Sequence, residues 1–365
     1  NSISSGRNKH RDANGQYPVF GSTGIIGYSS TYEYEGPVIL VARVGANAGT
    51  LNFASGQYDV SDNTLIITIK QNVYDYNFAY NQLTHYKLNK LVFGSGQPLI
   101  TSKQLKNIRI PVPPLAEQRK IAEVLGVWDE AIEKQARLIE KLALRKRALM
   151  QRLLSAKLRL PGFSEPWQKV KLGEICERVT RKNIEDNQNV MTISAQRGFV
   201  AQTDFFNKSV ASETLESYYL VFKDEFCYNK SYSNGYPMGA IKRLSEADKA
   251  VVTSLYICFN VKPETNTNID YLSYYFDNGG LNRGLTKIAN EGGRAHGLLN
   301  VTPKDFFGLS FEIPSLKEQT AIAEVLTAAD REIELAKEKL ERLRRQKRGL
   351  MQQLLSGKKR VKINI

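Results

Sequence analysis

The sequence is poor in the side chains from which metal and redox sites are usually built. Its 365 residues include three cysteines, three histidines and two tryptophans. Cys176, Cys227 and Cys258 are odd in number and lack the spacing of metal ligands, which fits packing residues in a reducing compartment. We therefore predict that this chain binds no metal and acts in the cytoplasm.

Sequence motifs of catalysis are also missing. There is no Walker A loop, no GxGxxG, no HExxH and no Asn/Asp-Pro-Pro-aromatic motif of amino-methyltransferases. His10, His85 and His296 are scattered, and Asp59 and Asp62 lack a basic partner at nuclease spacing, so we interpret the two aspartates as solvated turn residues. We therefore predict a protein that is not an enzyme and has no cofactor of its own.

No apolar run is long enough to cross a bilayer, so we expect no membrane association. The first residues, NSIS, show neither the basic nor the apolar region of a signal peptide. Because no methionine opens the chain, we expect that the printed sequence omits the true start.

Charge and length indicate the class of protein. A net charge of +14 and 42% hydrophobic residues are typical of a folded protein with a basic surface. Such a surface favours polyanionic partners, and without a membrane segment nucleic acid is the natural one. A chain of this length exceeds one compact core, so we expect two globular domains.

An internal repeat organises the chain. Residues 112–155 begin VPPLAEQRKIAEVL and end KRALMQRLLS, and residues 313–356 begin IPSLKEQTAIAEVL and end KRGLMQQLLS, at a constant offset of 201 without a gap. Half of the aligned positions are identical. The chain is therefore a duplication of one unit, a variable segment followed by a conserved one.

Each conserved segment has a seven-residue apolar period that predicts a long coiled-coil helix, over 113–156 and 313–357. Each helix would be roughly 60 Å long at ~1.5 Å per residue, so it needs a partner along its length. We expect the two helices to pair with each other in antiparallel fashion, related by a pseudo-twofold; pairing of each helix with another protein is the alternative. Lys146 and Lys347 fall on the apolar seam, where they either extend their amino groups to solvent or contact a partner. The seam positions are Ile121, Leu125, Trp128, Ile132, Gln135, Ile139, Leu142, Lys146, Leu149 and Leu153 in the first copy, with the same register in the second.

The variable segments are rich in β-type runs, such as residues 37–41, 64–69 and 254–259, separated by turn clusters. We predict the α+β class, with a mainly antiparallel or mixed sheet in each domain. The predicted division is domain 1 over 1–112, helix 1 over 113–156, domain 2 over 157–312, helix 2 over 313–357 and a basic tail over 358–365.

Glycine-rich polar loops occur at matching places in both variable segments. They are ARVGANAG (42–49) and GSGQP (94–98) in the first, and YNKSYSNGYPMGAIKR (228–243) and EGGRAHG (291–297) in the second. Glycine lets backbone approach a phosphate, and arginine, lysine, asparagine and glutamine can donate to phosphates or base edges. The candidate DNA-binding residues are Ser22, Thr23, Tyr28, Arg43, Asn47, Gln97, Gln196, Arg197, Lys230, Ser231, Tyr232, Asn234, Tyr236, Arg243, Arg294 and His296.

With these features the chain closely resembles the specificity (S) subunits of type I restriction-modification systems. The resemblance covers nearly the whole length and is most specific in IPVPPLAEQRKIAEVL, IPSLKEQTAIAEVL and LRLPGFSEPWQKVKLGEI (158–175), the segment that opens the second domain. The first domain lacks such an opening segment, so we expect its first helix or strand to be missing from the printed sequence.

The resemblance implies a specific function in a prokaryotic cytoplasm. Each variable domain would be a target recognition domain for one half of a bipartite double-stranded DNA site, and the helices would fix the gap between the halves. Two modification subunits would dock on this chain and transfer the methyl group of S-adenosylmethionine to adenine. Restriction subunits, which use ATP and Mg, would cleave and translocate DNA.

Two other hypotheses remain open at this point. The chain could be the detached recognition tail of a fused restriction-methylation enzyme, which requires a methylase domain upstream in the complete reading frame. It could also be a coiled-coil adaptor without a DNA role, in which case its assembled complex would shift no duplex.

Overall fold

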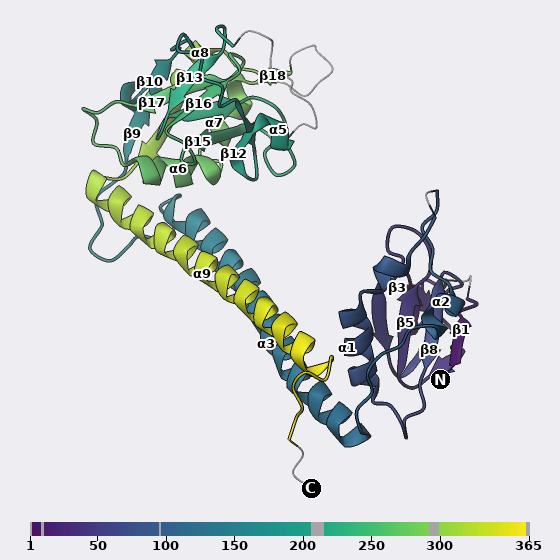
Figure 1. Ribbon diagram of the computed structural model, residues 1–365. Helices are drawn as coiled ribbons and strands as arrows, with labels where there is room; N and C mark the ends of the chain where they lie inside the picture. Colours follow the sequence, from purple (N-terminus) through teal and green to yellow (C-terminus); the bar gives the residue numbers. More distant parts are fainter. Residues whose placement is uncertain (1, 9–10, 95, 206–214, 292–298, 363–365) are drawn as a thin grey trace. The chain divides into compact units, whose positions relative to one another are not determined.

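The computed structural model describes residues 2–8, 11–94, 96–205, 215–291 and 299–362 (Figure 1). The chain forms two compact units: unit 1 comprises Asn1–Leu138 and Ala336–Ile365, and unit 2 comprises Ile139–Leu335. The division runs through both long helices, so each unit contains one variable domain and a stretch of each helix. Within the described ranges, no helix has the length and apolarity that a membrane crossing requires.

The domain of unit 1 is built on two four-stranded sheets. The strand orders are β1-β8-β5-β6, all antiparallel, and β3-β2-β7-β4, in which β2 and β7 run parallel. The prediction of a mixed sheet is confirmed for this domain. Its elements are β1 (Ser2–Ser5), β2 (Tyr17–Gly21), β3 (Gly24–Ser29), β4 (Tyr34–Glu35), β5 (Val38–Ala42), β6 (Leu51–Ala54), β7 (Gln57–Val60), β8 (Thr64–Thr68), α1 (Tyr76–Tyr86), η1 (Leu88–Leu91) and α2 (Ser102–Lys106).

Among its described residues, the domain of unit 2 contains a sheet of order β10-β17-β14-β15 and four two-stranded ladders, all antiparallel. Its elements are β9 (Gln168–Lys171), α4 (Leu172–Ile175), β10 (Cys176–Val179), β11 (Met191–Ser194), β12 (Gly198–Ala201), α5 (Gln202–Phe205), β13 (Tyr219–Phe222), β14 (Phe226–Asn229), β15 (Ala240–Arg243), β16 (Lys249–Val252), β17 (Ile257–Val261), α6 (Ile269–Asp277), α7 (Asn282–Ile288), β18 (Asn290–Glu291), β19 (Leu299–Asn300), α8 (Pro303–Phe307) and β20 (Ser310–Ile313). The strand predicted over 254–259 begins later, because a turn closes from Thr253 to Tyr256.

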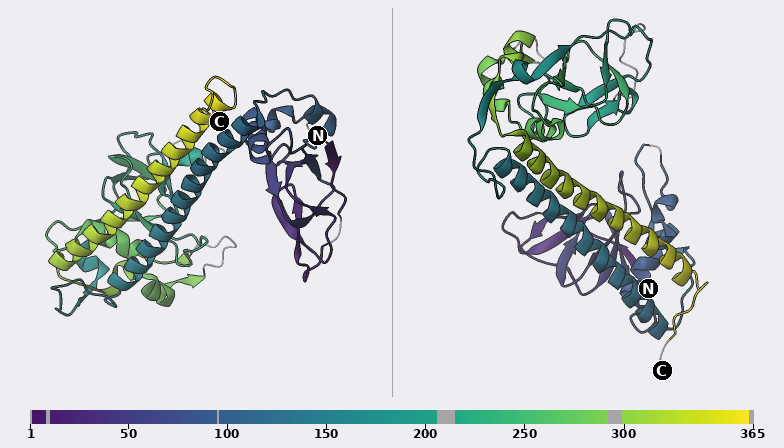
Figure 2. Two further views of the ribbon diagram at one scale, coloured as in Figure 1. Left: turned by 90° about the horizontal axis from the view of Figure 1, so that it is seen from below. Right: turned by 90° about the vertical axis from the view of Figure 1, so that its left-hand side faces the viewer.

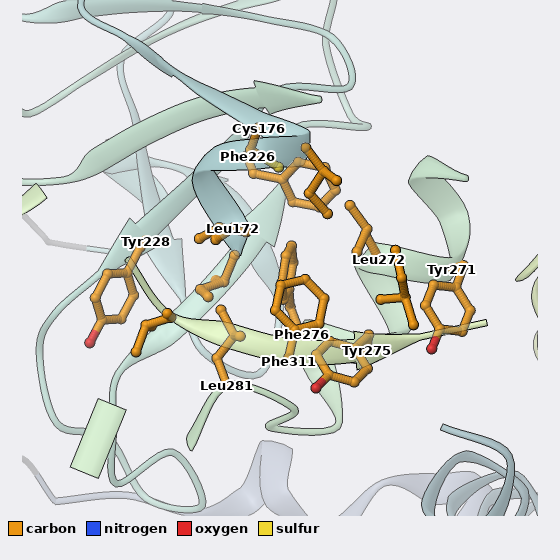
Figure 3. Packing of buried hydrophobic residues seen from close by; sticks show 14 of the residues in the cluster. Leu172, Cys176, Phe226, Tyr228, Tyr271, Leu272, Tyr275, Phe276, Leu281 and Phe311 are labelled. Carbon is orange, nitrogen blue, oxygen red and sulfur yellow. The ribbon is translucent and has the colours of Figure 1, made fainter. Parts of the chain in front are cut away.

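Aromatic rings fill the core of this second domain (Figure 3). Phe226 of β14 stacks on Phe259 of β17 with ring centroids 5.4 Å apart, and Phe276 of α6 meets Phe226 edge-on at 5.5 Å. Helix α6 is amphipathic and buries Tyr271, Leu272, Tyr275 and Phe276 in the same cluster. The start of α6 lies beside α9, because the backbone N–H of its N-cap, Asn268, donates to Gln319 Oε1.

The two long helices are α3 (Leu115–Leu153) and α9 (Leu316–Leu354), each slightly shorter than predicted. In each unit a stretch of α3 lies beside a stretch of α9 (Figure 2). In unit 1, Gln135 of α3 contacts Ala336 of α9, and Asp129 of α3 contacts Lys347 of α9. Residue numbers thus fall along α3 as they rise along α9. The antiparallel pairing of the two copies is therefore confirmed, and all predicted seam positions are buried or half-buried.

The seam lysines form ion pairs across the helix pair, which is more specific than either interpretation from the sequence. Lys146 Nζ lies 2.5 Å from Asp330 Oδ1 in unit 2, and Lys347 Nζ lies 2.5 Å from Asp129 Oδ1 in unit 1. Lys347 and Asp330 lie 201 positions after Lys146 and Asp129, so the two ion pairs occupy equivalent places in the repeat. The duplication thus preserves a polar contact as well as the apolar stripe.

The two domains differ at the strand that precedes each long helix. In unit 2, β20 pairs with β9, and the backbone N–H of the buried Leu172 donates to the carbonyl of Leu309 at 2.8 Å. In unit 1, the equivalent residues 109–112 form no strand, and an apolar cavity of about 280 Å³ is lined by Leu105 and Ile108, the latter the counterpart of Leu309.

Two expectations about single residues have different outcomes. The three cysteines are free and fully buried, which confirms that they pack in the interior. Burial raises the pKa of the Cys176 thiol to about 12. The interpretation of Asp59 as a solvated turn residue is wrong, because Asp59 lies in β7, is buried, and accepts hydrogen bonds from the Asn8 amide and the Val60 N–H.

Candidate nucleic-acid interface

In the first domain, tertiary contacts join the two predicted glycine-rich loops. The backbone N–H of Gly45 donates to the carbonyl of Pro98 at 2.8 Å, and the N–H of Ile100 donates to the carbonyl of Arg43 at 2.9 Å. These bonds gather the exposed side chains of Arg43, Asn47 and Gln97 on one edge of the domain. The arrangement presents one cation and two amides, which are the groups that read phosphates and base edges.

A second group in this domain lies on the β2–β3 hairpin. Ser22 and Thr23 form its two-residue turn, and Tyr28 lies on β3 with its side chain 47% exposed. Gly24 follows the turn with φ +96°, in the region that favours glycine, so the hairpin closes without strain. The hairpin therefore offers two hydroxyls and a flat aromatic face.

In the second domain, the β11–β12 turn is fastened to the segment between β14 and β15. Gln196 Nε2 donates to the carbonyl of Asn234 at 3.0 Å, and Asn229 Nδ2 donates to the carbonyl of Ile193 at 3.4 Å. Arg197, next in the turn, is exposed. The structure thus brings together residues that lie far apart in sequence and that were predicted separately.

The segment between β14 and β15 itself presents aromatic and basic side chains. Tyr232 is 65% exposed, and Tyr236 lies under the amino group of Lys242, which is 5.0 Å from the ring centroid. Partial burial lowers the pKa of Lys230, a cost that a bound phosphate would offset. Ser231 is half-buried, and its N–H donates to Asn229 Oδ1 at 3.0 Å.

Arg243 differs from the other candidates in this segment. Its Nη1 lies 2.6 Å from Asp270 Oδ1, and its Nε lies 3.8 Å from Asp224 Oδ1. The guanidinium therefore links β15 to α6 inside the domain, and contact with DNA stays a prediction for this residue. Arg294 and His296 lie outside the described residues.

The sequence interpretation missed the role of two dipeptides at the start of the long helices, in which Gln118 and Gln319 bind the backbone of the adjacent domain. They are the Glu-Gln dipeptides of the repeat, Glu117-Gln118 and Glu318-Gln319, and all four side chains are buried although they are polar. The sequence did carry a signal for them: both copies have the same two polar residues at the same place, off the apolar seam. Neither dipeptide is exposed enough to contact DNA.

No group of three or more histidine, cysteine, aspartate or glutamate residues that could hold a metal occurs in the part of the chain that the structure describes.

The sequence model of the family described as "Type I restriction modification DNA specificity domain" matches residues 5–143 and 164–345. The chain belongs to this family. The two matches correspond to the two copies of the duplication, each covering a variable domain and most of the helix that follows it. As a member of the family, the chain is a non-catalytic DNA specificity subunit of a type I restriction-modification system.

The relatives agree with this assignment, and the solved structures agree with the fold. The chain is 26% identical to the type I restriction enzyme MjaVIII specificity subunit of Methanocaldococcus jannaschii over 89% of this chain and 79% of the relative. It is 28% identical to the type I restriction enzyme EcoprrI specificity subunit of Escherichia coli over 31% of this chain and 28% of the relative. Its fold is similar to the crystal structure of the type I system S subunit from M. genitalium, with a TM-score of 0.57 and 18% identity over 97% of this chain and 93% of the other. A chain from a structural study of complex assembly in the type I system, 18% identical, covers 89% of this chain and 83% of its own length, with a TM-score of 0.52.

Proposed function

We propose that the two domains of this specificity subunit each read one half of a bipartite DNA sequence. The observation that carries the proposal is the repetition of one design: each domain gathers polar, basic and aromatic loop residues, and each is followed by one copy of the same helix. Pseudo-symmetric proteins of this kind suit half-sites separated by about one helical turn, roughly 34 Å.

The methyl transfer and the cleavage belong to partner proteins in this proposal. Two modification subunits would dock on the chain and supply S-adenosylmethionine chemistry at adenine, and restriction subunits would supply ATP- and Mg-dependent translocation and cleavage. Support comes from the relatives, which are specificity subunits of restriction enzymes, and from the structural neighbour that was solved to explain complex assembly in the type I system. The relatives come from prokaryotes, so the proposed place of action is the prokaryotic cytoplasm.

Methylome sequencing tests the proposal. A host without the system would express the chain together with its cognate modification subunit, and single-molecule sequencing would map methylated adenines. We expect one split motif with two defined halves and a fixed gap. Methylation without a split motif, or a split motif that is unchanged when the chain is omitted, would contradict the proposal.

A further inference from the structure

In unit 2, the buried Gln319 of α9 binds the backbone at the start of α6, a helix of the second domain. Gln319 Oε1 accepts from the backbone N–H of Asn268, the N-cap of α6, at 2.8 Å, and its Nε2 donates to the carbonyls of Pro314 and Asn266 at 2.9 and 3.3 Å. One planar amide therefore ties together the entry to α9 and the loop before α6. A buried group with both ends satisfied permits little rotation of one element on the other.

A second contact in the same unit joins α6 to both long helices. Tyr274 Oη donates to Asp330 Oδ2 at 2.8 Å, while Asp330 Oδ1 pairs with Lys146 of α3. Tyr274 Oη also lies 3.2 Å from Thr327 Oγ1, and the Lys146 amino group lies 5.1 Å from the tyrosine ring. One tyrosine of the recognition domain is thus bound to an ion pair that spans α3 and α9.

Unit 1 repeats the glutamine contact with its own residues. Gln118 Oε1 accepts from the N–H of Asp75, the N-cap of α1, at 2.9 Å, and its Nε2 donates to the carbonyls of Pro113 and Val73 at 2.9 and 2.8 Å. Burial raises the pKa of Tyr80 on α1, and the charge of Asp129, which pairs with Lys347, raises it further.

We propose that these contacts form a clamp (Gln319, Tyr274 and Asp330 in unit 2, with Gln118 in unit 1) that sets the gap length of the DNA site by fixing each recognition domain on its helices. The clamp residues are positioning residues and contact no DNA. The inference rests on the proposed bipartite function and adds to it the residues that hold the domains in register.

The mechanism follows from DNA geometry. One additional base pair moves the second half-site by ~3.4 Å and rotates it by about one tenth of a turn. A domain that cannot tilt on its helix excludes sites with a gap one base pair longer or shorter. A domain that can tilt would follow the displaced half-site, so the complex would also accept gaps that are one base pair longer or shorter. The loops that read the bases would stay unchanged.

The test compares gap tolerance in full chains assembled with the modification subunit. The variants are Tyr274→Phe, which keeps the buried ring and removes one hydroxyl, and the double variant Tyr274→Phe with Asp330→Asn. Glu332→Gln is the matched control, because Glu332 lies two residues from Asp330 on α9 and pairs with the exposed Arg145. Methylation is measured genome-wide and on duplexes that carry the wild-type half-sites with the native gap and with gaps one base pair longer and shorter.

We expect the ratio of methylation at the native gap to methylation at the altered gaps to fall by about tenfold or more in the double variant. In Tyr274→Phe the same ratio should fall several-fold, and both half-sites should stay unchanged in each variant. The control should match the wild type. An unchanged gap preference in a folded Tyr274→Phe and in the double variant would overturn the inference, as would altered bases within a half-site. If the wild type itself gave no split motif, the proposed function would fail instead, so the two failures are distinguishable.

Discussion

Arg159 and Glu318 form a two-pronged ion pair, with Nε 2.6 Å from Oε1 and Nη2 2.8 Å from Oε2. The pair joins the chain that leaves α3 to the first turn of α9 in unit 2. Arg360 and Glu117 repeat it in unit 1, with distances of 2.7 and 2.5 Å. The duplication therefore extends beyond the helices, and the basic tail has a structural role in this contact.

The first prediction concerns the effect of acidic pH on the ion pair between Glu117 and Arg360 of the C-terminal tail. Hydrogen bonds from Arg360 hold the pKa of Glu117 below its usual value of 4.5. A carboxylate with a depressed folded-state pKa stabilises the fold above its unfolded pKa, and that stabilisation is lost as the pH falls through the folded-state pKa. We expect Glu117→Gln to lower the unfolding temperature at about pH 7, and the difference from wild type to shrink below about pH 4. A difference that stays constant across this range, measured by calorimetry, would contradict the assignment.

The second prediction uses the helix ends. Gly357 follows α9 with φ +74°, and its counterpart Ala156 follows α3 with φ +57°. This left-handed conformation is strained for alanine, so Ala156→Gly should raise the free energy of unfolding by about 1 kcal/mol. The reciprocal Gly357→Ala should lower it by a similar amount. Urea denaturation of both variants measures the effect, and opposite signs are the expected result.

The third prediction concerns glycines inside the long helices. Gly126 in α3 and Gly349 in α9 have nothing within 4 Å of the position that a Cβ would occupy. Replacement by alanine should stabilise the protein by about 1 kcal/mol for each glycine, because alanine loses less backbone entropy in a helix. The counterpart of Gly349 is already Ala148. A decrease in the unfolding midpoint for either variant would show that the site is less open than the structure indicates.

The fourth prediction concerns the seam. Leu326 is fully buried between α9 and the core of unit 2, whereas Leu335 on the same helix is 47% exposed. Leu326→Ala should cost about 2–5 kcal/mol of unfolding free energy, since it removes buried methyl groups and leaves a cavity. Leu335→Ala should change it by no more than about 0.5 kcal/mol. Equal effects of the two substitutions would argue against the helix register described above.

The fifth prediction separates two basic residues of the second domain. Lys230→Ala should weaken DNA binding by the assembled complex and reduce its salt dependence by about one unit of log-log slope, the amount expected for one phosphate contact. Arg243→Gln should instead lower thermal stability, because Arg243 is paired with Asp270. Fluorescence anisotropy over a salt series measures the slope, and a Lys230→Ala variant with the wild-type slope would remove this residue from the interface.

The sequence by itself determined the duplication, the two long helices and the residues of their apolar seam. Helix formation and a seven-residue apolar period are local properties, so Leu125 and Leu326 could be assigned to the seam from spacing alone. The candidate loops were also visible, because glycine and polar residues mark turns wherever they occur. The composition and the missing motifs indicated a basic protein without chemistry of its own.

Only the tertiary structure decided which of these residues act together. Gln196 meets the loop of Asn234, Arg243 is engaged by Asp270, and Gln319 holds the N-cap of α6. Each of these contacts joins residues that are tens of positions apart, and side-chain spacing carries no information about such distances. The structure also separates the exposed loop residues from the buried Gln118 and Gln319, which bind the backbone at the start of α1 and α6.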